Sequence, residues 1–161
     1  MSASPGDTLA SQRKGESMSD PQETADFLAK VPLFQGLNKK QLQGLARSLV
    51  TREYAAGDEI VTQGEGGIGL FIVVSGKAEA VHTRADGSRV VVNTFGPTDF
   101  FGELAVLNDV PRTASVIATE AAKCLVLTRW ELLGKLKIDG EMAVVILQEL
   151  VKRFQRALGV L

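Results

Sequence analysis

The sequence predicts an α+β fold: a jelly-roll-like β-roll with one helical insertion, flanked by short N-terminal helices and by C-terminal helices. Three observations lead to this prediction. Seven short apolar runs lie between residues 49 and 128, and turns that contain glycine separate most of them. One segment inside this region, residues 101–107, lacks a strand pattern and is typical of one or two helical turns. Amphipathic segments with helical spacing precede and follow the strands, and evenly spaced short strands are typical of a sandwich or barrel.

The composition indicates one globular domain. The chain has 161 residues, of which 45% are hydrophobic and 23% charged. Its net charge of −1 argues against a surface that binds nucleic acid or an anionic membrane, and no apolar run is long enough to insert into a membrane. A single cysteine and a single histidine exclude a disulfide and a multi-histidine metal centre, so we expect no metal and no cofactor. No secretory signal is present, which predicts a cytoplasmic protein.

The N-terminal part divides into a leader and the start of the domain. Residues 1–23 are rich in serine and poor in large apolar side chains, so we expect a disordered leader there and a folded domain over residues 24–161. Residues 27–34 form a short amphipathic segment. Asn38 and Gln41 have the spacing of a capping box, which predicts that a helix begins at this point.

The central and C-terminal elements follow from apolar periodicity. Strands are expected at residues 49–54, 59–63, 69–75, 77–84, 89–95, 114–119 and 123–128, with a hairpin turn at Asp86-Gly87. Helices are expected at residues 129–135 and 140–158. We expect Trp130 to pack between the roll and these helices, Cys124 to lie in the core, and His82 to be exposed.

Residues 99–115 carry the candidate site. Gly102 starts a short helix, whose first N–H groups are unpaired and favour an anion. Arg112 follows the rigid Pro111 and offers a planar fork that suits phosphate oxygens. Glu103 would repel a phosphate, so its presence favours a ligand that also carries a hydroxyl donor. An anion beside a hydroxyl is the outline of a nucleotide.

The runs Phe-Gly-Glu-Leu-Ala at 101–105 and Pro-Arg-Thr-Ala at 111–114 (together, the cassette) resemble the phosphate-binding cassette of cyclic nucleotide-binding domains. That family includes kinase A regulatory subunits, cyclic nucleotide-gated channels and bacterial catabolite activator proteins. The resemblance implies that Arg112 binds the cyclic phosphate and Glu103 the ribose 2′-hydroxyl. It implies further ligand contacts from the backbone of Gly102, Leu104 and Ala105, from Thr113 and Ala114 beside the phosphate, and from Val92 and Arg153 near the base. Glu65 replaces the Asp usual in the family, at a position expected to be remote from the ligand.

The resemblance implies a sensor of cAMP or cGMP, not an enzyme, that passes ligand occupancy through its C-terminal helices to an unknown protein effector. In resembling domains, a Thr directly after the cassette Arg is associated with tolerance of cGMP, and Thr113 has this position. We expect a stand-alone module, because neither a helix-turn-helix nor membrane spans follow. Three alternatives stay open: the ligand-binding part of a larger regulator, a degenerate β-roll that serves assembly without binding nucleotide, and a cupin-type enzyme that would need a metal cluster.

The last helix predicts a homodimer through residues 144–161. Apolar residues recur there at spacings of three and four, as in a coiled-coil seam: Val144, Leu147, Val151, Phe154, Leu158 and Leu161. The alternative is that this face packs on the roll. We expect the off-seam residues Ile146, Leu150 and Ala157 to serve the roll and to leave the seam for a partner.

Overall fold

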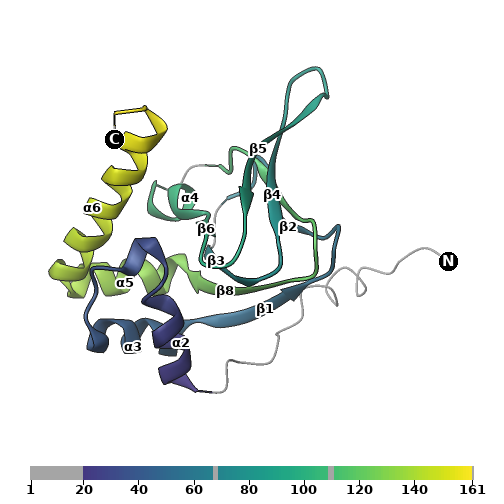
Figure 1. The fold of residues 1–161 in the computed structure, drawn as a ribbon. Helices are drawn as coiled ribbons and strands as arrows, with labels where there is room; N and C mark the ends of the chain where they lie inside the picture. Colours follow the sequence, from purple (N-terminus) through teal and green to yellow (C-terminus); the bar gives the residue numbers. More distant parts are fainter. Residues whose placement is uncertain (1–19, 67–68, 109–110, 161) are drawn as a thin grey trace.

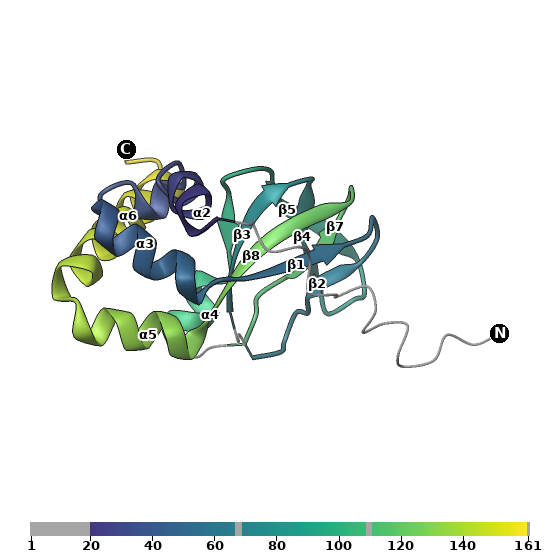
Figure 2. The same cartoon turned by 90° about the horizontal axis from the view of Figure 1, so that it is seen from below.

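The computed structural model describes residues 20–66, 69–108 and 111–160. Helices α2 (Pro21–Leu28), η1 (Pro32–Phe34) and α3 (Lys39–Ser48) precede the strands, and α5 (Arg129–Ile138) and α6 (Gly140–Ala157) follow them. The strands are β1 (Val50–Tyr54), β2 (Glu59–Val61), β3 (Gly69–Ser75), β4 (Ala78–Thr83), β5 (Arg89–Phe95), β6 (Phe100–Phe101), β7 (Ser115–Ala118) and β8 (Ala122–Thr128), with α4 (Glu103–Asn108) between β6 and β7. The helices gather at one end of the roll in both views (Figures 1 and 2). The predicted α+β fold is confirmed.

The first helix begins before the predicted domain boundary. Asp20 accepts a hydrogen bond from the N–H of Gln22 and caps α2, whose first residue is Pro21. Residues 21–23, which we assigned to the leader, therefore belong to the folded part. Residues 1–19 lie outside the described residues, so their disorder stays a prediction. The capping box at Asn38 and Gln41 is present as predicted.

The roll consists of two four-stranded antiparallel sheets, with the orders β1-β8-β3-β6 and β2-β7-β4-β5. Strand β6 was not predicted. Its residues Phe100 and Phe101 pair with Ile72 and Phe71 of β3, and both side chains are buried. The helical insertion that we expected from residue 101 therefore begins at Glu103.

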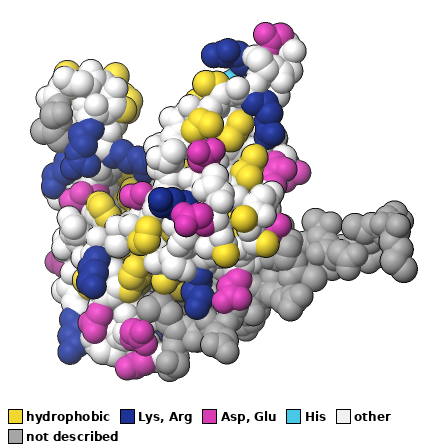
Figure 3. All heavy atoms as spheres, turned by 45° about the vertical axis from the view of Figure 1, so that its right-hand side comes forward, with side chains coloured by type: hydrophobic (Ala, Val, Ile, Leu, Met, Phe, Trp, Pro, Cys, Tyr) yellow, Lys and Arg dark blue, Asp and Glu magenta, His cyan; other side chains and the backbone are white. Residues whose placement is uncertain are grey.

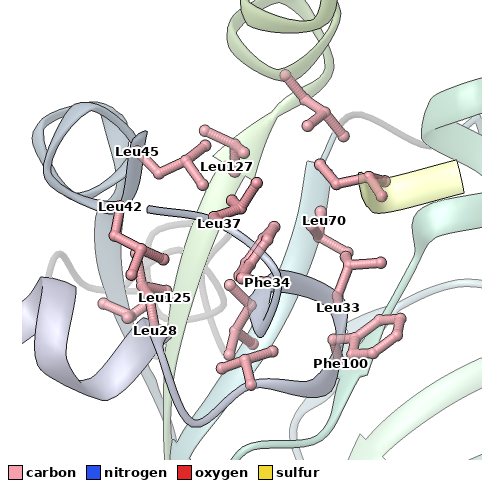
Figure 4. Close-up of a cluster of buried hydrophobic side chains, with 14 of the residues drawn as sticks. Leu28, Leu33, Phe34, Leu37, Leu42, Leu45, Leu70, Phe100, Leu125 and Leu127 are labelled. Atoms are coloured by element: carbon pink, nitrogen blue, oxygen red, sulfur yellow. The ribbon is translucent and has the colours of Figure 1, made fainter. Parts of the chain in front are cut away.

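The central strands separate two hydrophobic cores because side chains alternate along a strand. Leu70 and Ile72 of β3 face the helices and pack with residues such as Leu28, Phe34 and Leu45 (Figure 4). Phe71 and Val73 face the inside of the roll, where they join Cys124 of β8. Cys124 is 0% exposed, as expected of a core residue, and burial raises the pKa of its thiol to about 12.

The C-terminal helices differ from the prediction at two residues. Trp130 does not pack between the roll and the helices, because it is 78% exposed and Leu132 takes the inward position of α5. In α6, Ile146 is buried and Leu150 packs against the core, but Ala157, which we expected to face the roll, is exposed. Within the described part of the chain, no helix is long and apolar enough to cross a bilayer. The cytoplasmic location stays a prediction.

Candidate functional site

A cavity of about 300 Å³ opens between the roll and α6. It is bounded by β4, β5, the cassette and one side chain of α6. In the space-filling view the molecule is hollowed between α6 and the β4–β5 hairpin (Figure 3). Seven of the nine predicted site residues line this cavity: Val92, Gly102, Glu103, Arg112, Thr113, Ala114 and Arg153. The other two, Leu104 and Ala105, follow Glu103 in the first turn of α4.

The Arg112 side chain is the buried cation of the cavity. It is 8% exposed, its Nη2 donates to the carbonyl oxygen of Gly69 at 3.0 Å, and its Cζ lies 5.7 Å from the centre of the Phe71 ring. Burial lowers the pKa of the guanidinium, and the negative charge of Glu103 opposes this effect. Among the described residues Arg112 has no salt-bridge partner. A buried guanidinium without a carboxylate is a strong site for an anion, since an unpaired buried charge is costly.

Gly102 has a conformation and surroundings that exclude a side chain. Its φ is +91°, in the left-handed region that favours glycine. An ideal Cβ would lie 2.5 Å from Arg112 Nη1 and 2.7 Å from the Gly69 carbonyl oxygen. The bare backbone at Gly102 therefore leaves the space in which the guanidinium sits.

Glu103 is buried, and its carboxylate does not pair with Arg112. Glu103 is 7% exposed, and its Oε1 lies 3.0 Å from Nη1 of Arg153 on α6. Arg153 also places its Cζ 4.5 Å from the centre of the Phe100 ring, a cation–π contact. This ion pair joins the cassette directly to the last helix.

The opposite wall of the cavity is mainly apolar. Val92 of β5 is 57% exposed and borders the cavity. Phe101 stacks on Phe71 with ring centres 5.1 Å apart, and it also contacts Phe95. Such a wall suits the flat, weakly polar face of a base.

The loop after β2 lies closer to the site than we predicted. The Arg112 N–H donates to the carbonyl oxygen of Glu65 at 2.8 Å, and the Gly64 N–H donates to that of Arg112 at 2.8 Å. The expectation that Glu65 is remote from the ligand contacts is therefore wrong for its backbone, which holds the Arg112 backbone in place. Ser115 Oγ, which accepts the N–H of Gln63, ties the same loop to the cassette end.

Two site residues were missed by the sequence analysis. His82, which we expected to be exposed, is half-buried, because it lies against the cassette: its Nδ1 is 2.8 Å from the carbonyl oxygen of Thr113, so a ring N–H can donate to that oxygen. Asn93 borders the cavity beside Val92. Nothing in the local sequence marks His82. Asn93 could have been identified only by predicting the register shift between β4 and β5, which a sequence does not reveal.

The described residues contain no group of three or more His, Cys, Asp or Glu side chains arranged to hold a metal ion. The residues that line the cavity thus combine one buried cation, one buried carboxylate and an apolar wall.

Comparison with known proteins points to one family. The model of the cyclic nucleotide-binding domain family matches residues 51–139. A curated relative, the cAMP-dependent protein kinase regulatory subunit of Mycosarcoma maydis, is 42% identical over 108 residues, which are 65% of this chain and 20% of that protein. A second, from Colletotrichum orbiculare, is 41% identical over 61% of this chain and 24% of its own length. The matched part is therefore at most about a quarter of either relative.

A solved structure gives the same result for the fold. The regulatory domain of Toxoplasma gondii PKA, co-crystallised with cAMP, has a TM-score of 0.73 and 28% identity, over 84% of this chain and 50% of that chain. The family match over residues 51–139 includes the cassette.

Proposed function

The chain belongs to the cyclic nucleotide-binding domain family, and we propose that it is a sensor that binds cAMP or cGMP in this cavity and relays occupancy through α6. The family is defined by binding a ligand, and the curated relatives are regulatory subunits, so the chain is a binding domain and not an enzyme. One observation carries the proposed site: the Arg112 guanidinium is buried at the cavity without a salt-bridge partner among the described residues.

In this proposal the cavity divides into a phosphate end and a base end. Arg112 and the backbone at Gly102, Leu104 and Ala105 bind the cyclic phosphate, with Thr113 and Ala114 beside it. Glu103 accepts a hydrogen bond from the ribose 2′-hydroxyl, which offsets the repulsion between its carboxylate and the phosphate. The proposal is supported by the adjacency of the two groups, because a cyclic phosphate holds its anion next to that hydroxyl.

The proposed relay runs through the ion pair between Glu103 and Arg153. A ligand hydroxyl on Glu103 shares the carboxylate with Arg153, so occupancy changes the strength of this pair. Only Met142 and Ile146 of α6 are buried, both in its first half, and the contacts of its second half include the packing of Leu150 on the core and the contacts of Arg153 with Glu103 and Phe100. If α6 has two positions, a ligand that binds more tightly to one of them shifts the equilibrium toward that position, by as much as its affinities for the two differ.

The exposed face of α6 supports the proposed homodimer. Val144, Leu147, Val151, Phe154 and Leu158 are between 47% and 64% exposed, so this seam does not pack on the roll. Leu161 lies outside the described residues. A second copy that covers the seam would remove these apolar side chains from water. Binding to nucleic acid and insertion into a membrane are not part of the proposal. The effector stays unidentified, and action as a stand-alone module stays a prediction.

Calorimetric titration of an arginine variant tests the proposed function. Arg112→Ala should weaken cyclic nucleotide binding by roughly 2–4 kcal/mol, since truncating one member of a buried charge pair costs about 2–5 kcal/mol. Arg84→Ala, at an exposed arginine of the β4–β5 turn, is the matched control and should leave the affinity unchanged. Equal affinity of the wild type and Arg112→Ala would remove Arg112 from the site. A folded wild type that binds no cyclic nucleotide would favour the degenerate, assembly-only alternative.

Hydrogen–deuterium exchange tests the proposed relay. Ligand should change the exchange rate of residues 150–157 in the wild type. In Arg153→Ala the ligand should still bind, but this change should be lost. An unaltered response in the variant would contradict a relay through Arg153.

A further inference from the structure

Strand β5 carries a bulge at the wall of the cavity. Ala80 of β4 pairs with Asn93, whereas the next residue, Val81, pairs with Val91, so Val92 is an extra residue in β5. Directly opposed residues in a sheet share a face, and Ala80 lies inside the roll. The bulge thus lets Val92 and Asn93, which regular alternation would put on opposite faces, both border the cavity.

Asn93 is an exposed residue that adds a hydrogen-bond donor to this apolar wall. Its Oδ1 accepts the backbone N–H of Thr94 at 2.9 Å, which fixes the orientation of the planar amide. The Nδ2 atom is on the other side of the amide, and within the described residues it has no hydrogen-bond partner. Arg153 of α6, which also lines the cavity, carries only hydrogen-bond donors.

We propose that Asn93 reads the purine base and selects a 6-oxo purine, as in cGMP, over the 6-amino purine of cAMP. This inference rests on the proposed function. Guanine presents two acceptors, N7 and O6, on the edge where adenine presents the acceptor N7 and the N6 amino donor. A free asparagine amide can bind adenine by both of its atoms. In this chain Oδ1 is held at the strand backbone, so Nδ2 is the atom left to meet the base, and as a donor it matches O6.

The position in the cavity agrees with this role. Arg112 and Gly102 define the phosphate end of the cavity. Glu103 follows Gly102 and contacts Arg153 of α6. Asn93 and Val92 lie on the strand wall, so Val92 offers an apolar contact to the ring while Asn93 meets its edge.

Cyclic inosine monophosphate isolates this contact, because it carries the 6-oxo group of guanine but lacks the 2-amino group. The wild type should bind cyclic inosine monophosphate about tenfold more tightly than cAMP, the ratio expected from one additional hydrogen bond. Asn93→Leu should bring this ratio close to one. Asn93→Asp, which keeps the shape but replaces the donor by an acceptor, should favour cAMP.

Controls separate this contact from others. Thr94→Ala is the matched control, because Thr94 does not border this cavity and its backbone N–H remains. This variant should keep the wild-type ratio. A ratio that is the same in the wild type, Asn93→Leu and Asn93→Asp would overturn the role of Asn93 and leave the proposed function intact. A wild type that binds none of the nucleotides would overturn both.

Discussion

Replacing Gly102 by alanine tests whether the backbone at this residue is shaped around the Arg112 side chain. The φ of Gly102 is +91°, and a left-handed conformation costs an L-residue about 1–2 kcal/mol. Gly87, in the turn between β4 and β5, has a φ of +87° and no atom within 4 Å of an added Cβ. Gly87→Ala therefore introduces the backbone strain alone and is the matched control.

Gly102→Ala adds a steric conflict to the same strain. Its Cβ would lie 2.7 Å from the carbonyl oxygen of Gly69, which belongs to an inner strand of its sheet, and 2.5 Å from Arg112 Nη1. Because the side chain moves more easily than the strand, the guanidinium leaves its position and loses its hydrogen bond to Gly69. A hydrogen bond of a charged group contributes about 1.5–3 kcal/mol. We expect the free energy of unfolding to fall by about 3–5 kcal/mol in Gly102→Ala and by about 1–2 kcal/mol in Gly87→Ala.

Urea unfolding followed by circular dichroism measures both stabilities, and titration measures both affinities. Gly102→Ala should also bind cyclic nucleotide at least about tenfold more weakly, while Gly87→Ala binds as the wild type does. Equal losses of stability in the two variants, together with unchanged affinity, would refute the link between Gly102 and the position of Arg112.

Four further predictions concern single side chains. Glu103→Gln should weaken binding less than Arg112→Ala does, because the amide keeps one acceptor for the ribose hydroxyl; a larger loss in calorimetry would contradict this role. Thr113→Ala should lower the affinity for cGMP relative to cyclic inosine monophosphate, if the Thr113 hydroxyl meets the 2-amino group, and an unchanged ratio would limit Thr113 to the phosphate end. Phe154→Asp should convert a dimer to a monomer in sedimentation at tens of micromolar, whereas a wild type that is monomeric with and without nucleotide would contradict the dimer. Burial raises the pKa of the Cys124 thiol from 9.0 to about 12. The unfolded chain therefore loses the thiol proton at a lower pH than the folded chain does, so the free energy of unfolding should fall as pH rises from about 9 to about 12. Cys124→Ala should reduce that fall in urea titrations.

Most element boundaries followed from local patterns. Glycine turns and alternating apolar residues mark strands such as β3 and β4, and Asn38 with Gln41 marks the start of α3. The cassette was recognisable because its residue types are consecutive. These features depend on neighbours in the sequence, so the sequence alone predicts them.

Features that depend on tertiary pairing were not predictable. The bulge that turns Asn93 into the cavity exists only through the register of β5 on β4. The backbone contact between Glu65 and Arg112 joins segments that are far apart in the chain. Trp130 is exposed because Leu132 fills the inward position of α5, and the spacing of apolar residues does not show which of the two faces inward.

A calorimetric titration of the unmodified chain with cAMP, cGMP and AMP tests the central claim most directly. A cyclic phosphate holds its charge beside the 2′-hydroxyl, the arrangement that Arg112 and Glu103 match, whereas the phosphate of AMP is free to swing away from it. We predict saturable binding of at least one cyclic nucleotide at one site per chain, with AMP at least about tenfold weaker. Absence of binding, or equal binding of AMP and both cyclic nucleotides, would contradict the assignment of this cavity as a cyclic nucleotide site.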